Sequence, residues 1–200
     1  MIINKEEQSA AIGMILGDGY LQKTGARNAR LRLEHRADHA EYLVWKTRLL
    51  PKLFQGKAAF LKRMHPKTKH SYSYVRQQSN ASPWLGKLRS LFYGEGRRTI
   101  PQNLPKLLKS DIGFAVWFYD DGYYFVRDRA YYLYLGTVRQ EEAETARVTL
   151  NRNFGLKSRV LNKKQKGFCL YFPVSEREKI RTILKKHYVP VMSYKVGAPS

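Results

Sequence analysis

Two Asp-Gly pairs are the residues of this sequence best suited to do chemistry. Asp18 precedes Gly19 after the apolar run 12–16, and Asp121 precedes Gly122 after the apolar run 114–119, which is 103 residues later. A carboxylate at the C-terminal end of a helix opposes the helix dipole, typically by about 0.3–1 kcal/mol. Asp-Gly is also an ordinary helix stop, so one copy indicates only a turn. Two copies at matching places instead indicate paired carboxylates, which hold divalent metal ions for phosphodiester hydrolysis.

The net charge indicates the class of partner. The 200 residues contain 37 Lys and Arg against 16 Asp and Glu, for a net charge of +21. The excess is +12 in residues 1–100 and +9 in residues 101–200, unlike that of a basic tail or a single membrane-surface helix. A folded chain with evenly distributed positive charge favours a nucleic-acid partner. A basic ribosomal-type RNA binder would explain the charge equally well, but not the paired Asp-Gly motifs.

Other features exclude several classes of protein. The apolar runs are too short to span a bilayer, and Glu6 and Glu7 interrupt any secretory signal pattern. The single cysteine, Cys169, excludes internal disulfides and a multi-thiolate zinc site, and its apolar surroundings predict a buried structural thiol. We therefore expect an intracellular protein without a membrane partner, in a bacterial or archaeal cytoplasm or an organelle matrix.

The order of predicted elements repeats along the chain. Periodicity predicts helix, two strands, helix, two strands and helix in the first half, over 6–18, 20–23, 28–36, 38–54, 58–64, 71–78 and from 82 onward. The second half has the same order, over 109–121, 123–127, 130–138, 140–154, 157–163, 168–174 and 176–187. Ser175 and Glu178 predict a capping box for the last helix. We therefore predict an α+β fold of two αββαββα repeats, 1–96 and 109–200, joined by a linker over 97–108.

The first helix of each repeat is expected to pack against the other along the repeat interface. Small residues that permit a close approach lie on both helices, namely Ala10, Gly13, Gly17, Gly113 and Ala115. Such packing would bring Asp18 and Asp121 together. Carboxylate oxygens are hard ligands, so the expected ion is Mg²⁺, with Mn²⁺ as a substitute.

The helix ends resemble the two signature motifs of the LAGLIDADG homing endonucleases, in the variant forms Ile-Leu-Gly-Asp-Gly and Trp-Phe-Tyr-Asp-Asp-Gly. The resemblance covers nearly the whole chain and includes segments 97–104 and 189–195. Together these segments are similar to the single-chain, two-motif branch of the family.

The resemblance implies both an activity and its residues. The fold would be a saddle of two antiparallel DNA-reading sheets. The activity would be metal-dependent double-strand cleavage of a long asymmetric site across the minor groove by a monomer, leaving short 3′ overhangs. The implied catalytic residues are Asp18, Asp121, Lys195 and Arg98, and the implied metal-binding residues are Asp18, Asp121, Gly17 and Asp120. Relatives carry lysine where this chain has Arg98, and arginine serves poorly in proton transfer, so Lys195 is the better candidate for that role.

Three predicted strand faces are suited to reading DNA. Strand 28–36 alternates between polar and apolar residues, and guanidinium groups on its polar face can reach guanine edges and phosphates. The expected DNA-binding residues are Asn28, Arg30, Arg32, Glu34, Arg36, Lys62, Arg63, Tyr72, Tyr74, Arg76, Gln78, Arg159 and Lys163. A solvated outer sheet face is the alternative for any one strand. Strand 130–138 is rich in tyrosine and poor in charge, so the two half-sites are expected to differ.

Two other functions fit the same fold. An intron RNA maturase or a non-cleaving DNA-binding protein would use the same basic surfaces, with intron RNA as a partner in the first case. Degenerate members of the family lose one or both motif carboxylates, whereas this sequence has both, which favours cleavage. No flanking splicing domains accompany the two repeats, which favours a free-standing or intron-encoded protein over an intein insert.

Overall fold

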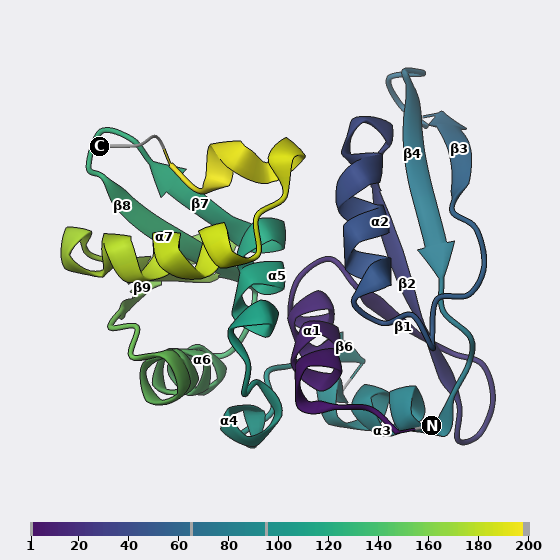
Figure 1. Ribbon diagram of the computed structural model, residues 1–200, viewed down its shortest axis with the longest axis horizontal. Coiled ribbons are helices and arrows are strands. Elements are labelled where there is room, and N and C mark those ends of the chain that lie inside the picture. The colour runs from purple at the N-terminus through teal and green to yellow at the C-terminus, as the bar shows by residue number, and fades with distance from the viewer. Residues whose placement is uncertain (1, 65, 95, 198–200) are drawn as a thin grey trace. The chain divides into compact units, whose positions relative to one another are not determined.

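The chain divides into two compact units. The computed structural model describes residues 2–64, 66–94 and 96–197. Unit 1 comprises residues 18–90, and unit 2 comprises the described residues of 2–17 and 91–197 (Figure 1). The first helix of the chain therefore belongs to the same unit as the second half. No helix among the described residues is long and apolar enough to cross a membrane.

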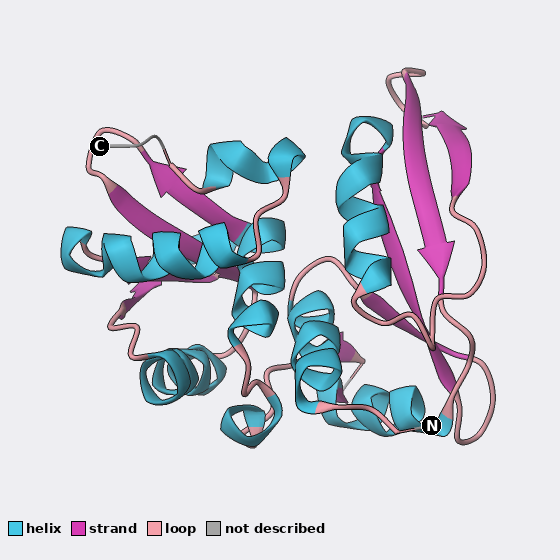
Figure 2. Cartoon of the chain, in the orientation of Figure 1, coloured by secondary structure: helices cyan, strands magenta, loops and turns pink. Residues whose placement is uncertain are grey.

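The helices and strands follow the predicted order (Figure 2). In the first half they are α1 (Lys5–Leu16), β1 (Tyr20–Lys23), β2 (Ala29–Arg36), η1 (Ala37–His39), α2 (Ala40–Arg48), β3 (Ala59–Met64), β4 (Ser71–Gln78), α3 (Pro83–Phe92) and β5 (Tyr93–Gly94). In the second half they are β6 (Arg97–Arg98), α4 (Leu104–Leu107), α5 (Asp111–Asp121), β7 (Gly122–Phe125), β8 (Ala130–Gly136), α6 (Gln140–Phe154), β9 (Arg159–Asn162), η2 (Lys164–Lys166), β10 (Phe168–Phe172), η3 (Val174–Glu176), α7 (Arg177–Lys186) and η4 (Pro190–Lys195).

Unit 1 is built on an antiparallel sheet in the order β1-β2-β4-β3. Along β2, Ala29, Leu31 and Leu33 are fully buried, whereas the alternate residues Arg30 and Arg32 are partly exposed. This period of two places one face of the strand against the core, where α2 packs on β2 and β4. The other face carries the polar side chains.

Unit 2 contains a sheet in the equivalent order, β7-β8-β10-β9. Its core is aromatic, since Phe114 contacts Phe118 and Phe172, and Phe118 meets the ring of Tyr131 edge-on. Helix α6 packs against β9 and β10, and α5 packs against α7, β7 and β8. The matching strand orders confirm the predicted repeat.

Two local predictions are wrong. The predicted helix 38–54 is shorter, because Pro51 has no amide hydrogen for the carbonyl of Thr47, and the N–H of Leu50 bonds to that carbonyl instead. The predicted capping box of Ser175 and Glu178 is absent, because η3 precedes α7 and the cap makes no side-chain hydrogen bond. Glu178 instead pairs with arginines of its own helix. The segment predicted as a linker contains β6 and α4.

Helices α1 and α5 approach each other through glycine. A Cβ on Gly13 would overlap the backbone carbonyl of Gly113, and one on Gly113 would overlap that of Ser9. The buried hydroxyl of Ser9 accepts hydrogen bonds from the backbone N–H groups of Lys109 (3.0 Å) and Ser110 (2.9 Å). The predicted packing of the two motif helices through small residues is confirmed.

An ion pair anchors the segment that precedes α4. Both terminal nitrogens of Arg97 donate to the carboxylate of Glu142, at 2.9 and 2.8 Å. Burial raises the pKa of Glu142, but hydrogen bonds from Arg97 and the backbone of Arg139 outweigh it and hold the pKa below its usual 4.5. This pair fixes β6 to the start of α6.

We predict that Gly13→Ala lowers the free energy of unfolding by about 1–3 kcal/mol or more, because the added methyl group overlaps backbone that has no room to move. Urea unfolding measures the loss. Gly56→Ala is the matched control, since a Cβ there meets nothing within 4 Å. Equal losses in the two variants would contradict the close packing.

We predict that Glu142→Gln destabilises the protein at pH 7 by on the order of 1 kcal/mol. Because the folded-state pKa of Glu142 is depressed, its stabilisation is present above the unfolded value and is lost as the pH falls below about 4.5. Urea unfolding at pH 7 and at about pH 3 should therefore show the gap between wild type and variant closing. A double-mutant cycle with Arg97→Gln supplies the control, and additive losses would exclude the pair as the cause.

Candidate functional site

The C-terminal end of α1 packs closely against α5 at a glycine. Gly17 is the C-cap of α1, and a Cβ at this position would overlap the carboxylate of Asp120 on α5. Both residues belong to unit 2. The next residue, Asp18, is outside the helix, and 51% of its side chain is exposed. Glycine is thus required where α1 meets α5.

Arg98 caps the C-terminal end of α1. Its guanidinium donates hydrogen bonds to the backbone carbonyl of Ile15, at 3.1 Å, and to that of Gly17. The last carbonyls of a helix have no partners within the helix, and a cation near them is favourable. Arg98 therefore stabilises the helix end that directly precedes Asp18.

Lys195 caps the end of α5 in the same manner. Its Nζ donates to the carbonyls of Tyr119, at 2.6 Å, and Asp120, at 2.7 Å. The neighbouring carbonyl of Val196 accepts a hydrogen bond from the hydroxyl of Tyr131, at 2.5 Å, which fixes the segment carrying Lys195. Each motif helix thus ends against a basic side chain from a distant segment.

Asp121 is the last residue of α5 and is half-buried. The following Gly122 begins β7, and a Cβ there would overlap the carbonyl oxygen and ring of Phe118. The turn from helix to strand therefore requires glycine directly after the carboxylate. The predicted helix-end position of Asp121 is confirmed.

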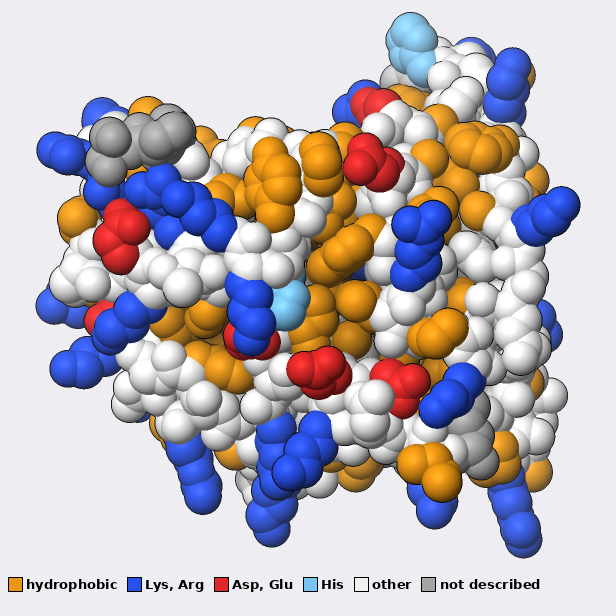
Figure 3. Space-filling model, viewed as in Figure 1, with side chains coloured by type: hydrophobic (Ala, Val, Ile, Leu, Met, Phe, Trp, Pro, Cys, Tyr) orange, Lys and Arg blue, Asp and Glu red, His pale blue; other side chains and the backbone are white. Residues whose placement is uncertain are grey.

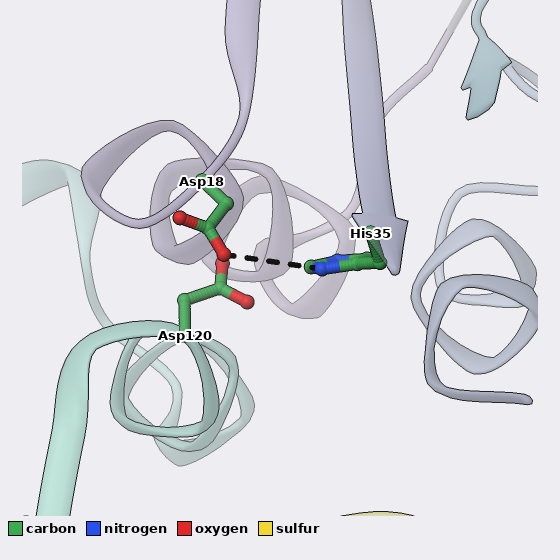
Figure 4. Close-up of side chains that lie close together, drawn as sticks. All are labelled: Asp18, His35 and Asp120. Carbon is green, nitrogen blue, oxygen red and sulfur yellow. Dashed lines mark ion pairs between the residues drawn. The ribbon is translucent and has the colours of Figure 1, made fainter. Parts of the chain in front are cut away.

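Asp18 has a buried partner that the sequence interpretation missed. Nδ1 of His35 lies 3.9 Å from Oδ2 of Asp18 (Figure 4). On its other side, Nε2 of His35 lies 3.3 Å from Nζ of Lys46, which is fully buried. The available signal was an imidazole on the core-facing side of β2, together with a lysine on the buried stripe of α2.

The polar face of the unit 1 sheet carries a connected set of arginines. The carboxylate of Glu34 lies 2.8 Å from Arg76, 3.3 Å from Arg32 and 3.6 Å from Arg63. The guanidinium groups of Arg63 and Arg76 lie 4.9 and 5.3 Å from the ring centre of Tyr74. One carboxylate thus fixes three guanidinium groups on a single face.

The other residues of unit 1 that were predicted to bind DNA differ in their partners and in the face on which they lie. Arg30 donates to Gln78 at 2.9 Å, and Arg36 pairs with Asp38 at 2.7 Å. Asn28 precedes β2 and is exposed, as is Tyr72. Lys62 pairs with Ser73 in the β3–β4 register, so it points away from the face that carries Arg63. The structure therefore does not bring Lys62 to this face.

The corresponding face of the unit 2 sheet is aromatic. The rings of Tyr132 and Tyr171 lie 5.3 Å apart, and Nζ of Lys163 lies 5.4 Å from the ring centre of Tyr132. Arg159 pairs with Tyr171 in the register of β9 and β10. The thiol of Cys169 is buried, which raises its pKa and confirms the predicted structural cysteine.

Lys and Arg side chains are scattered over the surface drawn in Figure 3 and outnumber the Asp and Glu side chains there. This surface matches the composition of the chain, with 37 Lys and Arg against 16 Asp and Glu. A polyanion is the partner that such a surface favours.

Known proteins of similar sequence are of two kinds. The chain is 29% identical to protein RecA of Mycobacterium shimoidei over 131 residues, which is 64% of this chain and 28% of that protein. It is 29% identical to a probable intron-encoded DNA endonuclease 3 of Mycosarcoma maydis over 110 residues, which is 53% of this chain and 80% of that protein. The chain spans less than half the length of the RecA proteins that it matches.

Solved structures share the fold. The homing endonuclease I-WcaI bound to its DNA recognition sequence has a TM-score of 0.88 at 21% identity, covering 100% of this chain and 89% of that chain. I-DmoI in complex with DNA and Ca has a TM-score of 0.56 at 14% identity, covering 94% and 96%. The model of the LAGLIDADG DNA endonuclease family matches residues 8–180, which include both Asp-Gly motifs. The chain belongs to the LAGLIDADG family of DNA endonucleases.

Proposed function

We propose that this chain is a sequence-specific double-strand DNA endonuclease that uses divalent metal ions. It cuts a long asymmetric site across the minor groove and leaves short 3′ overhangs. The observation that carries the proposal is the repeated helix end, where a motif aspartate lies at the end of a helix whose last carbonyls accept hydrogen bonds from Arg98 or Lys195. A helix stop alone requires neither basic side chain.

The donor atoms fit a hard divalent cation. Asp18 and Asp121 offer carboxylates, and Gly17 and Asp120 offer further oxygens at the packed ends of α1 and α5. All of these donors are oxygen, the element that Mg²⁺ and Mn²⁺ prefer. The ion would neutralise charge on the scissile phosphate and lower the pKa of a bound water.

The basic residues have distinct roles in this proposal. Arg98 and Lys195 hold the helix ends rigid through their carbonyl contacts. Lys195 is the residue proposed for proton transfer, because an ammonium group gives up its proton more readily than a guanidinium. Arg98 stabilises negative charge on the phosphate. The carboxylates of Asp18 and Asp121 each serve one DNA strand.

The two sheets supply unequal reading surfaces. We assign DNA contacts in unit 1 to the arginine face and its neighbours, and those in unit 2 to Arg159 and Lys163. Arginine forks recognise guanine edges, whereas tyrosines offer apolar and hydroxyl contacts. Two different faces on one monomer favour an asymmetric target. Repeats 1–96 and 109–200, joined by 97–108, are the proposed functional halves.

We predict that Asp18→Asn and Asp121→Asn each abolish double-strand cleavage in Mg²⁺ but retain DNA binding, because an amide is a poorer ligand than a carboxylate. Selection from a random duplex library, followed by cleavage and binding assays, measures both properties. Asp128→Asn, an exposed aspartate paired with Arg127, is the control.

Two results of that assay would overturn the proposal. Sequence-specific binding that leaves the DNA intact in Mg²⁺ and Mn²⁺ would identify a non-cleaving DNA-binding protein. Intron splicing that survives both substitutions, without DNA cleavage, would identify an intron RNA maturase.

We predict that Arg63→Ala weakens binding to the selected duplex about tenfold and reduces the salt dependence, since Arg63 lies on the proposed reading face. Lys62→Ala is the matched control, because it removes one positive charge from the adjacent residue on the opposite face. Fluorescence anisotropy at several salt concentrations measures both effects. Equal losses of affinity in the two variants would contradict the proposed reading face. They would mean that the DNA binds another surface, or that only the total charge of the protein attracts it.

A further inference from the structure

A buried chain of polar groups leads from the core of unit 1 to Asp18. Lys46 is 0% exposed, and its Nζ contacts Nε2 of His35 at 3.3 Å. Nδ1 of the same imidazole faces Oδ2 of Asp18 at 3.9 Å (Figure 4). The ring of Tyr42 packs 5.0 Å from the imidazole and 5.0 Å from Nζ of Lys46. All four residues belong to unit 1.

The contact with the lysine bears on which imidazole nitrogen carries the hydrogen. Nζ of Lys46 is a hydrogen-bond donor, and its donation to Nε2 of His35 places the ring hydrogen on Nδ1. Nδ1–H therefore points toward Asp18 as a donor and is not a lone pair for a metal ion. The 3.9 Å separation exceeds a direct hydrogen bond, so this donor acts on the carboxylate through the field of its dipole or through one water.

The strand position of His35 carries a different residue in the second repeat. Tyr20 pairs with Arg32 after the first Asp-Gly motif, and Tyr123 pairs with Tyr132 after the second. Counting three residues along each partner strand makes Leu135 the equivalent of His35. Leucine has no side-chain hydrogen-bond donor, so Leu135 cannot act on a carboxylate in the way proposed for His35.

We propose that His35, oriented by Lys46, is a positioning residue for Asp18. The inference rests on the proposed function, in which each motif aspartate serves one DNA strand. Nδ1–H, acting through its dipole or one water, would restrain one carboxylate oxygen of Asp18 and leave the other available to a metal ion. Loss of a polar group that supports a metal ligand typically lowers metal affinity or activity about 10–100-fold. The loss is therefore expected on one strand.

The test measures the cleavage of each strand separately. A supercoiled plasmid carrying the duplex selected by the wild-type protein is cut, and end-labelled fragments report the rate for each strand. His35→Leu, which installs the residue of the second repeat, is expected to slow one strand about 10–100-fold and to accumulate circles nicked in the other. Lys46→Met is expected to slow the same strand. His35→Asn is expected to restore part of the rate, because its amide nitrogen replaces Nδ1.

A structural role would give a different result. Leu33→Val is the matched control, since Leu33 is buried on the same face of β2 and has no polar group that could act on Asp18. It is expected to lower the melting temperature and to leave the ratio of the two strand rates unchanged. Equal slowing of both strands by His35→Leu, or no slowing, would overturn the inference. Wild-type protein that cuts neither strand would instead overturn the proposed function.

Discussion

The close approach of α1 and α5 is the constraint on which the rest of unit 2 depends. At Gly13 and Gly113 the helices meet backbone to backbone, with no side chain between them. Such contact fixes the distance between the two helices, because backbone cannot move aside as a side chain can. The end of each helix is then held by a separate basic residue. The backbone contact therefore sets the positions of the two helix ends, and the basic side chains hold the terminal carbonyl groups in place.

Short-range patterns in the sequence predicted most of the helices and strands. The strands Tyr20–Lys23 and Ser71–Gln78 and the helix Gln140–Phe154 match the predicted bounds, because alternation and capping signals are local. Gly155, with φ of 66°, ends that helix as predicted. The predicted helix 38–54 was too long, because a favourable apolar stripe continues past Pro51 although the backbone hydrogen bonds do not.

The sequence predicted the acidic residues of the candidate site but not the contacts that support them. Asp18 and Asp121 could be proposed from the sequence because their motif repeats and resembles that of a known family. The contacts of His35 and Lys46 were not visible, since the two residues come from a strand and a helix whose packing the sequence does not state. The carbonyl contacts of Arg98 and Lys195 also join segments far apart in the chain. Long-range hydrogen bonds of this kind leave no periodic signal.

The capping of both motif helices by distant segments has a consequence for how the protein is made. A growing chain completes the α1 end only after Arg98 has been added, and the α5 end only after Lys195 has been added. Synthesis from the N-terminus thus supplies the basic partner of the α1 carbonyls near the midpoint of the chain and that of the α5 carbonyls only near its end. Because α1 also packs against α5, neither helix end can have all of its contacts until the second half of the chain has been made.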